Sequence, residues 1–275
     1  MPDIFAVIGG DSRMRYLAEY LSAEGACVRT FAAPDLPDTE ENLKKTLHLA
    51  KYVILPMPVL AADGSIRNGR NLPLLPEQLA DFLSPNAVVF GGKLDGAAAV
   101  FRAAASKVED YAGWEPLIID NIVPTAEGAI GLILQHLPVT IHGSRFLITG
   151  AGRIGMCLAM KLQALGGHVT VTARKERDFA RIRSLGLDAD TTKQYTRGLG
   201  QYHCILNTIP ARVFTASQLA DVHPSCAVIE LASQPGGFPQ GTVPVISGAA
   251  LPGRTSPKTA GEIIATHILQ YIRTE

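Results

Sequence analysis

Short apolar runs alternate with amphipathic stretches along the first half of the chain. Strand-like runs stand at IFAVIG, ACVRTF, YVILP and AVVFG, and helix-like stretches follow at 13–23, 77–82 and 95–105. Strands that alternate with helices are typical of a parallel sheet that is covered on both faces. The pattern therefore predicts a doubly wound α/β domain in this half.

The same alternation returns in the second half of the chain. Strands are predicted at 145–149, 168–173, 203–207, 226–231 and 243–246. Between the halves, an apolar stretch runs from Pro124, which suits a first helical turn, to Leu137. The last helix, at 257–271, has no further strand to follow it, so its apolar face is predicted to pack back on the first domain.

The resulting fold is α/β, with two Rossmann-like doubly wound parallel-sheet domains joined by a linker helix and with the C-terminal helix crossing back to the first domain. The expected segments are an N-terminal, flavodoxin- or Rossmann-like substrate domain (1–123), the linker helix (124–141), a nucleotide-binding Rossmann domain (142–255) and the returning helix (256–275). Substrate and cofactor would meet in the cleft that this last helix closes.

A glycine-rich turn follows the strand at 145–149. Gly150 suits the tight turn, Gly152 lets the backbone approach a pyrophosphate, and Gly155 lets the next helix pack closely on the strand. Arg153 and Ile154 lie within the same turn, at a helix N-terminus that favours phosphate. A strand, this turn, a helix and a second strand together predict a dinucleotide site.

The end of the second strand indicates which dinucleotide is bound. An acidic residue is expected there when the ribose carries a free 2′-hydroxyl, but the chain has Thr172, Arg174 and Lys175. Arginine and lysine suit a 2′-phosphate, so NADP(H) is predicted. The alternative is that both cations are solvated and that Glu176 supplies the acid.

Two later strand exits offer polar groups beside the cofactor. The first contains Asn207, Thr208 and Pro210, and the second contains Glu230 and Gln234. In a dinucleotide domain these exits face the nicotinamide ring. Ordinary turn chemistry is the alternative for each of them.

Candidate substrate residues cluster at the predicted strand exits of the first domain and at the two crossing helices. Arg13 and Lys93 each follow a Gly-Gly pair, Asn121 and Thr125 lie at the entrance of the linker helix, and Lys258 lies in the first turn of the last helix. A cation at a helix N-terminus is locally unfavourable, and an anionic ligand would offset that cost. Single basic residues are also common on plain solvated surfaces.

Composition narrows the class of protein. The 275 residues carry 25 basic and 25 acidic side chains, which gives no electrostatic reason to expect nucleic acid or a membrane as partner. The apolar run at 130–137 is too short to span a bilayer, and the N-terminus does not resemble a signal peptide, so a cytoplasmic protein is expected. No CxxC or HExxH spacing occurs, and no metal is predicted.

Six segments in order carry a resemblance over essentially the whole chain. They are VIGGDSR, NIVPTAEGAI, TGAGRIG, NTIPA, ELASQPGG and LPGRTSPKTAGEII. With them, the chain resembles the dipicolinate synthase A-subunit family of spore-forming bacteria. More distantly it is similar to 2-hydroxyacid dehydrogenases and alanine dehydrogenase, where a catalytic histidine occupies the position of Lys258. That departure argues against hydroxyacid chemistry.

The resemblance implies a specific reaction. An intermediate of the dihydrodipicolinate type, derived from 4-hydroxy-tetrahydrodipicolinate, would be oxidised with NADP to pyridine-2,6-dicarboxylate during sporulation. Arg13, Lys93 and Lys258 would hold the two carboxylates, with Asn121 and Thr125 in support. The resemblance also implies a homo-oligomer, a location in the mother cell and a flavoprotein-like B subunit.

Two other functions stay open on the sequence. One is an NADP-dependent dehydrogenase of another small carboxylate, which would work without a partner subunit. The other is a non-catalytic, nucleotide-binding regulatory subunit.

Overall fold

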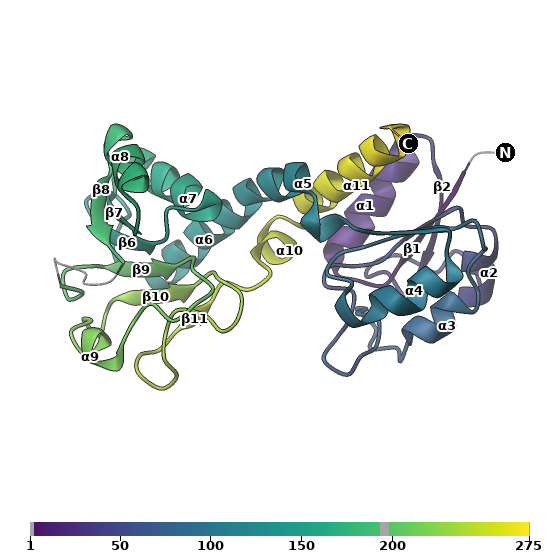
Figure 1. Cartoon of the computed structure of the whole chain (residues 1–275), viewed down its shortest axis with the longest axis horizontal. Helices are drawn as coiled ribbons and strands as arrows, with labels where there is room; N and C mark the ends of the chain where they lie inside the picture. Colours follow the sequence, from purple (N-terminus) through teal and green to yellow (C-terminus); the bar gives the residue numbers. More distant parts are fainter. Residues whose placement is uncertain (1–2, 193–197, 275) are drawn as a thin grey trace. The chain divides into compact units, whose positions relative to one another are not determined.

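The computed structural model describes residues 3–192 and 198–274. It divides into two compact units, each built on a parallel sheet (Figure 1). Unit 1 comprises Met1–Asn121 and Pro252–Glu275, and unit 2 comprises Ile122–Leu251. Two Rossmann-like α/β units are therefore present, and the C-terminal helix belongs with the first, as the sequence predicts.

Unit 1 contains a five-stranded sheet in the order β2-β1-β3-β4-β5, with every pair parallel. Its strands are β1 (Ile4–Ile8), β2 (Cys27–Phe31), β3 (Tyr52–Ile54), β4 (Val88–Gly91) and β5 (Lys107–Asp110). Its helices are α1 (Ser12–Ala23), α2 (Leu43–His48), α3 (Pro76–Ala80), α4 (Ala98–Ala104), α5 (Glu115–Asp120) and α11 (Pro257–Thr274). The short α10 (Leu251–Thr255) lies at the boundary between the units.

Alternate residues of β1 enter two separate cores, because successive side chains of a strand point to opposite faces. Phe5 and Val7 pack in the core with α1 and α11, whereas Ala6 and Ile8 pack in the core with α2, α3 and α4. Helix α11 lies alongside α1 (Figure 1). Gly261 permits this approach, since a Cβ there would lie 2.3 Å from the Arg13 carbonyl oxygen.

Unit 2 contains a six-stranded parallel sheet in the order β11-β10-β9-β6-β7-β8. Its strands are β6 (Arg145–Thr149), β7 (His168–Ala173), β8 (Asp188–Thr191), β9 (Cys204–Asn207), β10 (Ala227–Glu230) and β11 (Ile246–Ser247). Its helices are α6 (Ile122–His136), α7 (Arg153–Ala164), α8 (Glu176–Ser184) and α9 (Ala216–Leu219). The strand order reverses between β6 and β9, which is where ligands bind in such sheets.

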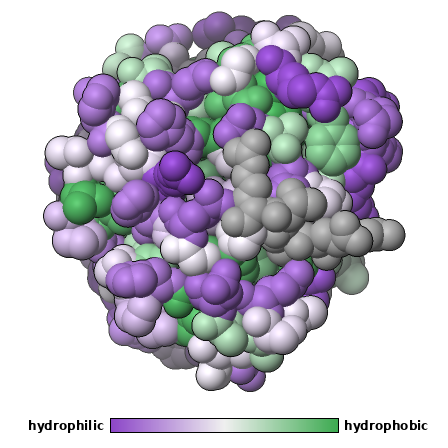
Figure 2. Space-filling view, turned by 90° about the vertical axis from the view of Figure 1, so that its left-hand side faces the viewer, coloured by the Kyte–Doolittle hydropathy of each residue, from purple (hydrophilic) through white to green (hydrophobic). Residues whose placement is uncertain are grey.

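The two faces of the unit 2 sheet are covered differently. Phe146 and Ile148 of β6 pack in a core with α6 and α7, whereas Leu147 packs with loop residues such as Phe214 and Phe238. The view onto the side of unit 2 that carries β8 and α8 is largely hydrophilic, with small apolar spots (Figure 2). This side is a polar outer surface of the unit.

Several elements depart from the sequence prediction. Strands β5 and β8 were not predicted because both lie at sheet edges and read KVED and DADT, without an apolar run. Helices α2, α5 and α9, which have only four to six residues, and α8 were also not predicted. The strand predicted at 243–246 is wrong for most of its length, since β11 starts only at Ile246; Pro244 lacks an amide hydrogen for a ladder.

The apolar helical stretch is longer than the run at 130–137 suggested. Glu115–His136, which comprises α5 and α6, contains an 18-residue window with a mean hydropathy of 1.6 and is long and apolar enough to cross a membrane by length and composition. Ala126, Ala129 and Ile133 of α6 are fully buried in the core of unit 2. Burial of this kind gives a core helix the same apolar composition.

Candidate functional site

The glycine-rich turn between β6 and α7 has the geometry of a phosphate-binding turn. Gly150 adopts a φ of +98°, which favours glycine, and a Cβ at Gly155 would lie 2.1 Å from the Gly150 carbonyl oxygen. At Gly152, the N-cap of α7, a Cβ would meet no atom within 4 Å. The turn is thus closely packed at Gly155 and open at Gly152, where a pyrophosphate would approach the helix N-terminus.

A pocket of about 460 Å³ lies beside this turn. Five cationic side chains and one carboxylate, that of Asp178, line it together with Gly150 and Gly152. The cations are Arg153, Arg174, Lys175, Arg177 and Arg181. A pocket with this excess of positive charge at a helix N-terminus fits a phosphorylated dinucleotide.

The lining bears on the choice between a free ribose and a 2′-phosphate. Arg174 and Lys175 are exposed and line the pocket, whereas Glu176 is not among the lining residues. Asp178 does line it, and its carboxylate lies 3.6 Å from Nε of Arg177. The carboxylate that does line the pocket, that of Asp178, is therefore beside a guanidinium.

Sequence reasoning missed Arg177 and Arg181. Their spacing of four residues places both on one face of α8, and both line the pocket. That spacing was the available signal, but α8 itself was not predicted.

Thr172 lies beneath the turn. It is fully buried, and its hydroxyl oxygen accepts hydrogen bonds from the Gly150 amide at 3.3 Å and from the Thr192 hydroxyl at 3.2 Å. Thr192, which sequence reasoning missed, also lines the pocket. Thr172 therefore supports the turn from within.

Asn207 is also fully buried and bonded within the protein. Its Oδ1 accepts from the Thr149 hydroxyl, and its Nδ2 donates to the Ile209 carbonyl at 2.8 Å and to Glu230 Oε1 at 2.7 Å. These bonds use both ends of the amide. The Asn207 side chain therefore lies inside the protein, where it links the carboxyl ends of neighbouring strands.

The neighbours of Asn207 are placed differently. The Thr208 hydroxyl donates to the Thr149 carbonyl at 2.7 Å and lies against Gly150. Pro210 is exposed, Ile154 is half-buried, and neither lines the pocket; Ile209 lines it instead. Ile209 is an apolar residue within a turn, and sequence reasoning had no signal for it.

In unit 1, Arg13 is buried and already paired. Its Nε and Nη2 donate to the two carboxylate oxygens of Asp11, each at 2.8 Å, and Nη2 also donates to the Met57 carbonyl. Burial alone would raise the pKa of Asp11, but the hydrogen bonds and charge of Arg13 outweigh it and lower that pKa. Arg13 is thus held as one half of a neutralised pair, and Nη1 takes no part in these bonds.

The two candidate lysines are exposed. Lys93 has a φ of +55°, and its backbone amide donates to Asp110 at 2.9 Å, so the turn after β4 is capped while the side chain projects from it. Lys258, in the first turn of α11, is 70% exposed, with its Nζ 3.9 Å from Glu262. Both side chains are accessible to a solution anion.

The remaining candidates lie at the junction of α5 and α6. Asn121 caps the C-terminus of α5 in unit 1, and Thr125 lies in α6 of unit 2; both are half-buried and have partners. Arg13, Lys93, Asn121 and Lys258 therefore belong to unit 1. Arg13 and Lys93 follow β1 and β4 and so lie at the carboxyl edge of its sheet.

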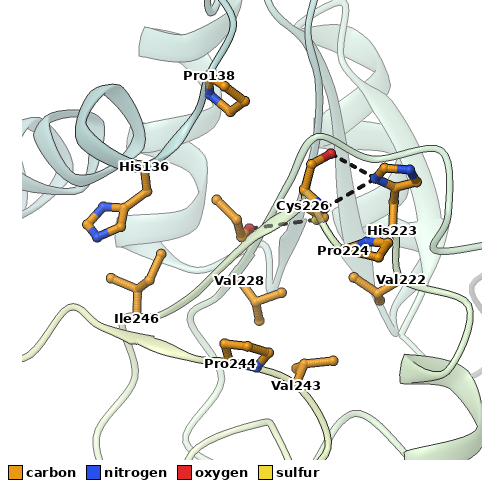
Figure 3. Close-up of a pocket in the computed structure, with 12 residues that line it drawn as sticks. His136, Pro138, Val222, His223, Pro224, Cys226, Val228, Val243, Pro244 and Ile246 are labelled. Carbon is orange, nitrogen blue, oxygen red and sulfur yellow. Dashed lines mark hydrogen bonds between the residues drawn. The ribbon is translucent and has the colours of Figure 1, made fainter.

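A second pocket of unit 2 lies at the opposite, amino-terminal edge of the sheet (Figure 3). It has a volume of about 430 Å³ and is mainly apolar, with Val228, Pro244 and Ile246 among its lining residues. Burial raises the pKa of the Cys226 thiol to about 12, so this cysteine is no thiolate nucleophile at neutral pH. The pocket lacks the glycine turn and the cations of the first one.

Comparison with known proteins places the chain in a family. The family model of the N-terminal domain of the dipicolinate synthase A-subunit matches residues 4–105. The curated dipicolinate synthase A-subunit of Bacillus subtilis (strain 168) is 30% identical, covering 94% of this chain and 92% of the relative.

Solved structures agree. The crystal structure of the dipicolinate synthase A-subunit from Bacillus halodurans is 28% identical, with a TM-score of 0.84 over 98% of this chain and 97% of that one. A transhydrogenase from Sinorhizobium meliloti, 14% identical with a TM-score of 0.70 over 98% and 93% of the two chains, shares the fold. Extent, identity and fold together show that this chain belongs to the dipicolinate synthase A-subunit family.

Proposed function

We propose that this chain is an NADP-dependent oxidoreductase that oxidises an intermediate of the dihydrodipicolinate type to pyridine-2,6-dicarboxylate. The family supports the product, and the cation-lined pocket beside the open Gly152 supports the cofactor. That pocket is the single observation that carries the assignment of NADP(H). Removal of two hydrogens from a partly reduced ring produces an aromatic pyridine, so the reaction depends mainly on orientation and a proton acceptor.

In unit 2, the turn Gly150, Gly152, Gly155 and the first amides of α7 would bind the pyrophosphate. Arg174 and Lys175 would bind the 2′-phosphate, with Arg177 and Arg181 adding positive charge. When bound, NADP⁺ supplies the hydride acceptor. Thr172 and Asn207 would support the cofactor site indirectly, since Thr172 holds the glycine turn and Asn207 holds the strand exits by hydrogen bonds within the protein.

In unit 1, Lys93 and Lys258 would bind the carboxylates of the substrate, because both ammonium groups are exposed. Arg13 would add positive charge for the carboxylates at the carboxyl edge of the sheet, and its guanidinium also anchors the loop by donating to the Met57 carbonyl. Asn121 and Thr125 would add polar support. Two fixed cations favour a dianion over a monoanion of the same shape.

The relatives are named as one lettered component of a synthase, which supports a partner in the form of a second component. We propose a flavoprotein-like B subunit in that role and a homo-oligomer of this chain. We also propose that the protein works in the cytoplasm of the mother cell during sporulation.

An activity measurement tests this function. The purified chain, NADP⁺ and freshly generated 4-hydroxy-tetrahydrodipicolinate are combined with and without the candidate B subunit, and the absorbance of NADPH and of pyridine-2,6-dicarboxylate is followed. Both signals should rise together. If neither absorbance rises in any combination, although NADPH binding is measured, the result would contradict the proposal and favour another substrate or a regulatory subunit.

Variants of the lysines test the substrate site. K258A and K93A should each weaken pyridine-2,6-dicarboxylate binding about 10-fold, as expected for one charge-assisted contact, and leave NADPH affinity unchanged. Lys44, a lysine on α2, supplies the matched control K44A. Unchanged dicarboxylate affinity in both variants would remove these lysines from the site.

A further inference from the structure

We infer that Glu230 is a positioning residue, which ties the loop after β10 to the strand exits of unit 2 and so shapes the nicotinamide side of the NADP(H) site. The inference rests on the proposed function. It concerns a residue that the cofactor need not touch.

Glu230 is the last residue of β10, and its carboxylate accepts three hydrogen bonds. Oε1 accepts from Asn207 Nδ2 at 2.7 Å and from the Ala232 amide at 3.0 Å, and Oε2 accepts from the Gly237 amide at 2.7 Å. Two of these donors are backbone amides of the following loop. The carboxylate therefore holds that loop at its start, at Ala232, and near its middle, at Gly237.

The connection continues into the sheet through Asn207. Its Oδ1 accepts from the hydroxyl of Thr149, the last residue of β6, which directly precedes Gly150. A chain of side-chain bonds thus joins the exits of β6, β9 and β10, three neighbouring strands. Loop, strand exits and glycine turn form one hydrogen-bonded assembly.

The loop is packed tightly onto this assembly. A Cβ at Gly237 would lie 2.6 Å from Cγ of Asn207, and a Cβ at Gly236 would lie 2.8 Å from Oε2 of Glu230. Gly236 also has a φ of +72°, which favours glycine. The backbone at this point approaches the two polar side chains more closely than any other residue type would allow.

The location of the loop indicates which half of the cofactor it serves. The cations lie at the exits of β6 and β7, on one side of the reversal in strand order, and Glu230 lies on the other side, beyond β9. A dinucleotide crosses a Rossmann sheet at this reversal. Glu230, Gln234 and Gly236 also line a pocket of about 270 Å³ here, where the nicotinamide end would lie.

The isosteric variant E230Q separates the charge from the shape. A glutamine amide replaces one carboxylate oxygen by an NH₂ group, which cannot accept a hydrogen bond. All three partners of Glu230 are donors, so at least one of the three bonds is lost. The affinities of NADPH and of 2′-phospho-ADP-ribose, which lacks the nicotinamide ring, are measured by calorimetry for wild type and E230Q. E127Q is the matched control, because Glu127 is an exposed acid of α6 in the same unit and does not line the cation-lined pocket.

We expect E230Q to weaken NADPH binding about 10-fold, as for the loss of one charge-assisted hydrogen bond, and to leave the affinity of the ring-less fragment unchanged. E127Q should bind both ligands as wild type does. Equal weakening of both ligands would show a general loosening of unit 2 and overturn the inference. Unchanged NADPH affinity would also overturn it.

Hydrogen exchange at the Gly237 amide gives an independent readout without cofactor. Exchange should be faster in E230Q than in wild type, and equal protection would overturn the inference. A wild-type chain that binds neither ligand would contradict the proposed function, and with it the cofactor role of Glu230. In that case, faster exchange at Gly237 in E230Q would still show that Glu230 restrains the loop.

Discussion

The two units carry glycine-rich strand exits that look alike in sequence and differ in structure. In unit 1, a Cβ at Gly10, after β1, would lie 2.2 Å from Cγ of Met14, and one at Gly92, after β4, would lie 2.5 Å from Cβ of Met57. In unit 2, a Cβ at Gly152 would meet nothing within 4 Å. Gly10 and Gly92 serve close packing in unit 1, whereas Gly152 leaves open space in unit 2.

The charged side chains next to these turns also differ between the two units. In unit 1 the guanidinium of Arg13, which follows Gly9 and Gly10 in the chain, is buried and paired with Asp11. In unit 2, five cations and one carboxylate line the pocket among the residues that the structure describes. An open glycine surface together with an excess of cations therefore distinguishes the unit 2 turn as a phosphate site.

The largest effect is expected from Gly155→Ala. The added Cβ would lie 2.1 Å from the carbonyl oxygen of Gly150, a backbone atom that cannot turn aside, so α7 has to shift. Overpacking of this kind costs about 2 kcal/mol or more, and the turn should lose NADPH affinity by a factor of about 100. Urea unfolding and calorimetry measure both quantities. Native affinity in this variant would contradict the account of the turn.

Gly10→Ala makes the corresponding change in unit 1. The residue has a φ of +91°, and its Cβ would meet Met14, so we expect a loss of about 1–3 kcal/mol of stability. NADPH affinity of the folded protein should stay unchanged, because unit 2 keeps its site. A loss of NADPH affinity equal to that of Gly155→Ala would remove the distinction between the units.

Gly152→Ala should show the opposite pattern. The methyl group meets no protein atom, so stability should change by less than about 1 kcal/mol, but it occupies the space where the pyrophosphate approaches. We expect about 10-fold weaker NADPH binding, measured by calorimetry alongside a thermal melt. Unaltered binding would show that phosphates do not approach this glycine.

Arg174→Ala tests whether the pocket cations of unit 2 bind the 2′-phosphate. NADPH affinity should fall about 10-fold with NADH affinity unchanged, since only the 2′-phosphate is lost between the two ligands. Arg183→Ala is the control, because Arg183 is exposed on α8 but does not line the pocket. Equal losses for NADPH and NADH would place Arg174 elsewhere on the cofactor.

The smallest effect concerns the paired charges of unit 1. Because the pKa of Asp11 is lowered in the folded state, its stabilisation is present above the ordinary carboxyl pKa of about 4 and is lost as the pH falls through the lower folded value. The unfolding free energy of wild type should therefore fall more steeply below about pH 4 than that of Asp11→Asn. Parallel curves for the two proteins would contradict the role of this pair.

Much of the fold could be predicted from the sequence, because buried central strands such as β6 and β9 are nearly continuous apolar runs. Edge strands β5 and β8 could not, since their sequences, KVED and DADT, contain no apolar run. At the site, Gly150, Gly152 and Gly155 follow a motif with a known mechanism, so their geometry was predictable.

The side-chain partners were not predictable. Asn207 was expected to face the cofactor, but its amide is bonded to Thr149, Ile209 and Glu230. Arg13 was expected to hold a carboxylate of the substrate, and it already holds that of Asp11. The bonds of Asn207 to Thr149 and Glu230 depend on which strand exits are neighbours in the sheet, and a linear sequence does not contain that order. The pair of Arg13 with Asp11 is local, between residues two apart, and depends on the conformation of the turn.

The most direct test of the central claim is the ratio of the dissociation constants of NADPH and NADH for the purified chain, measured at one fixed salt concentration. The cation-lined pocket beside Gly152 predicts that NADPH binds at least about 10-fold more tightly, and that added salt narrows the difference. Equal affinities, or tighter binding of NADH, would contradict it.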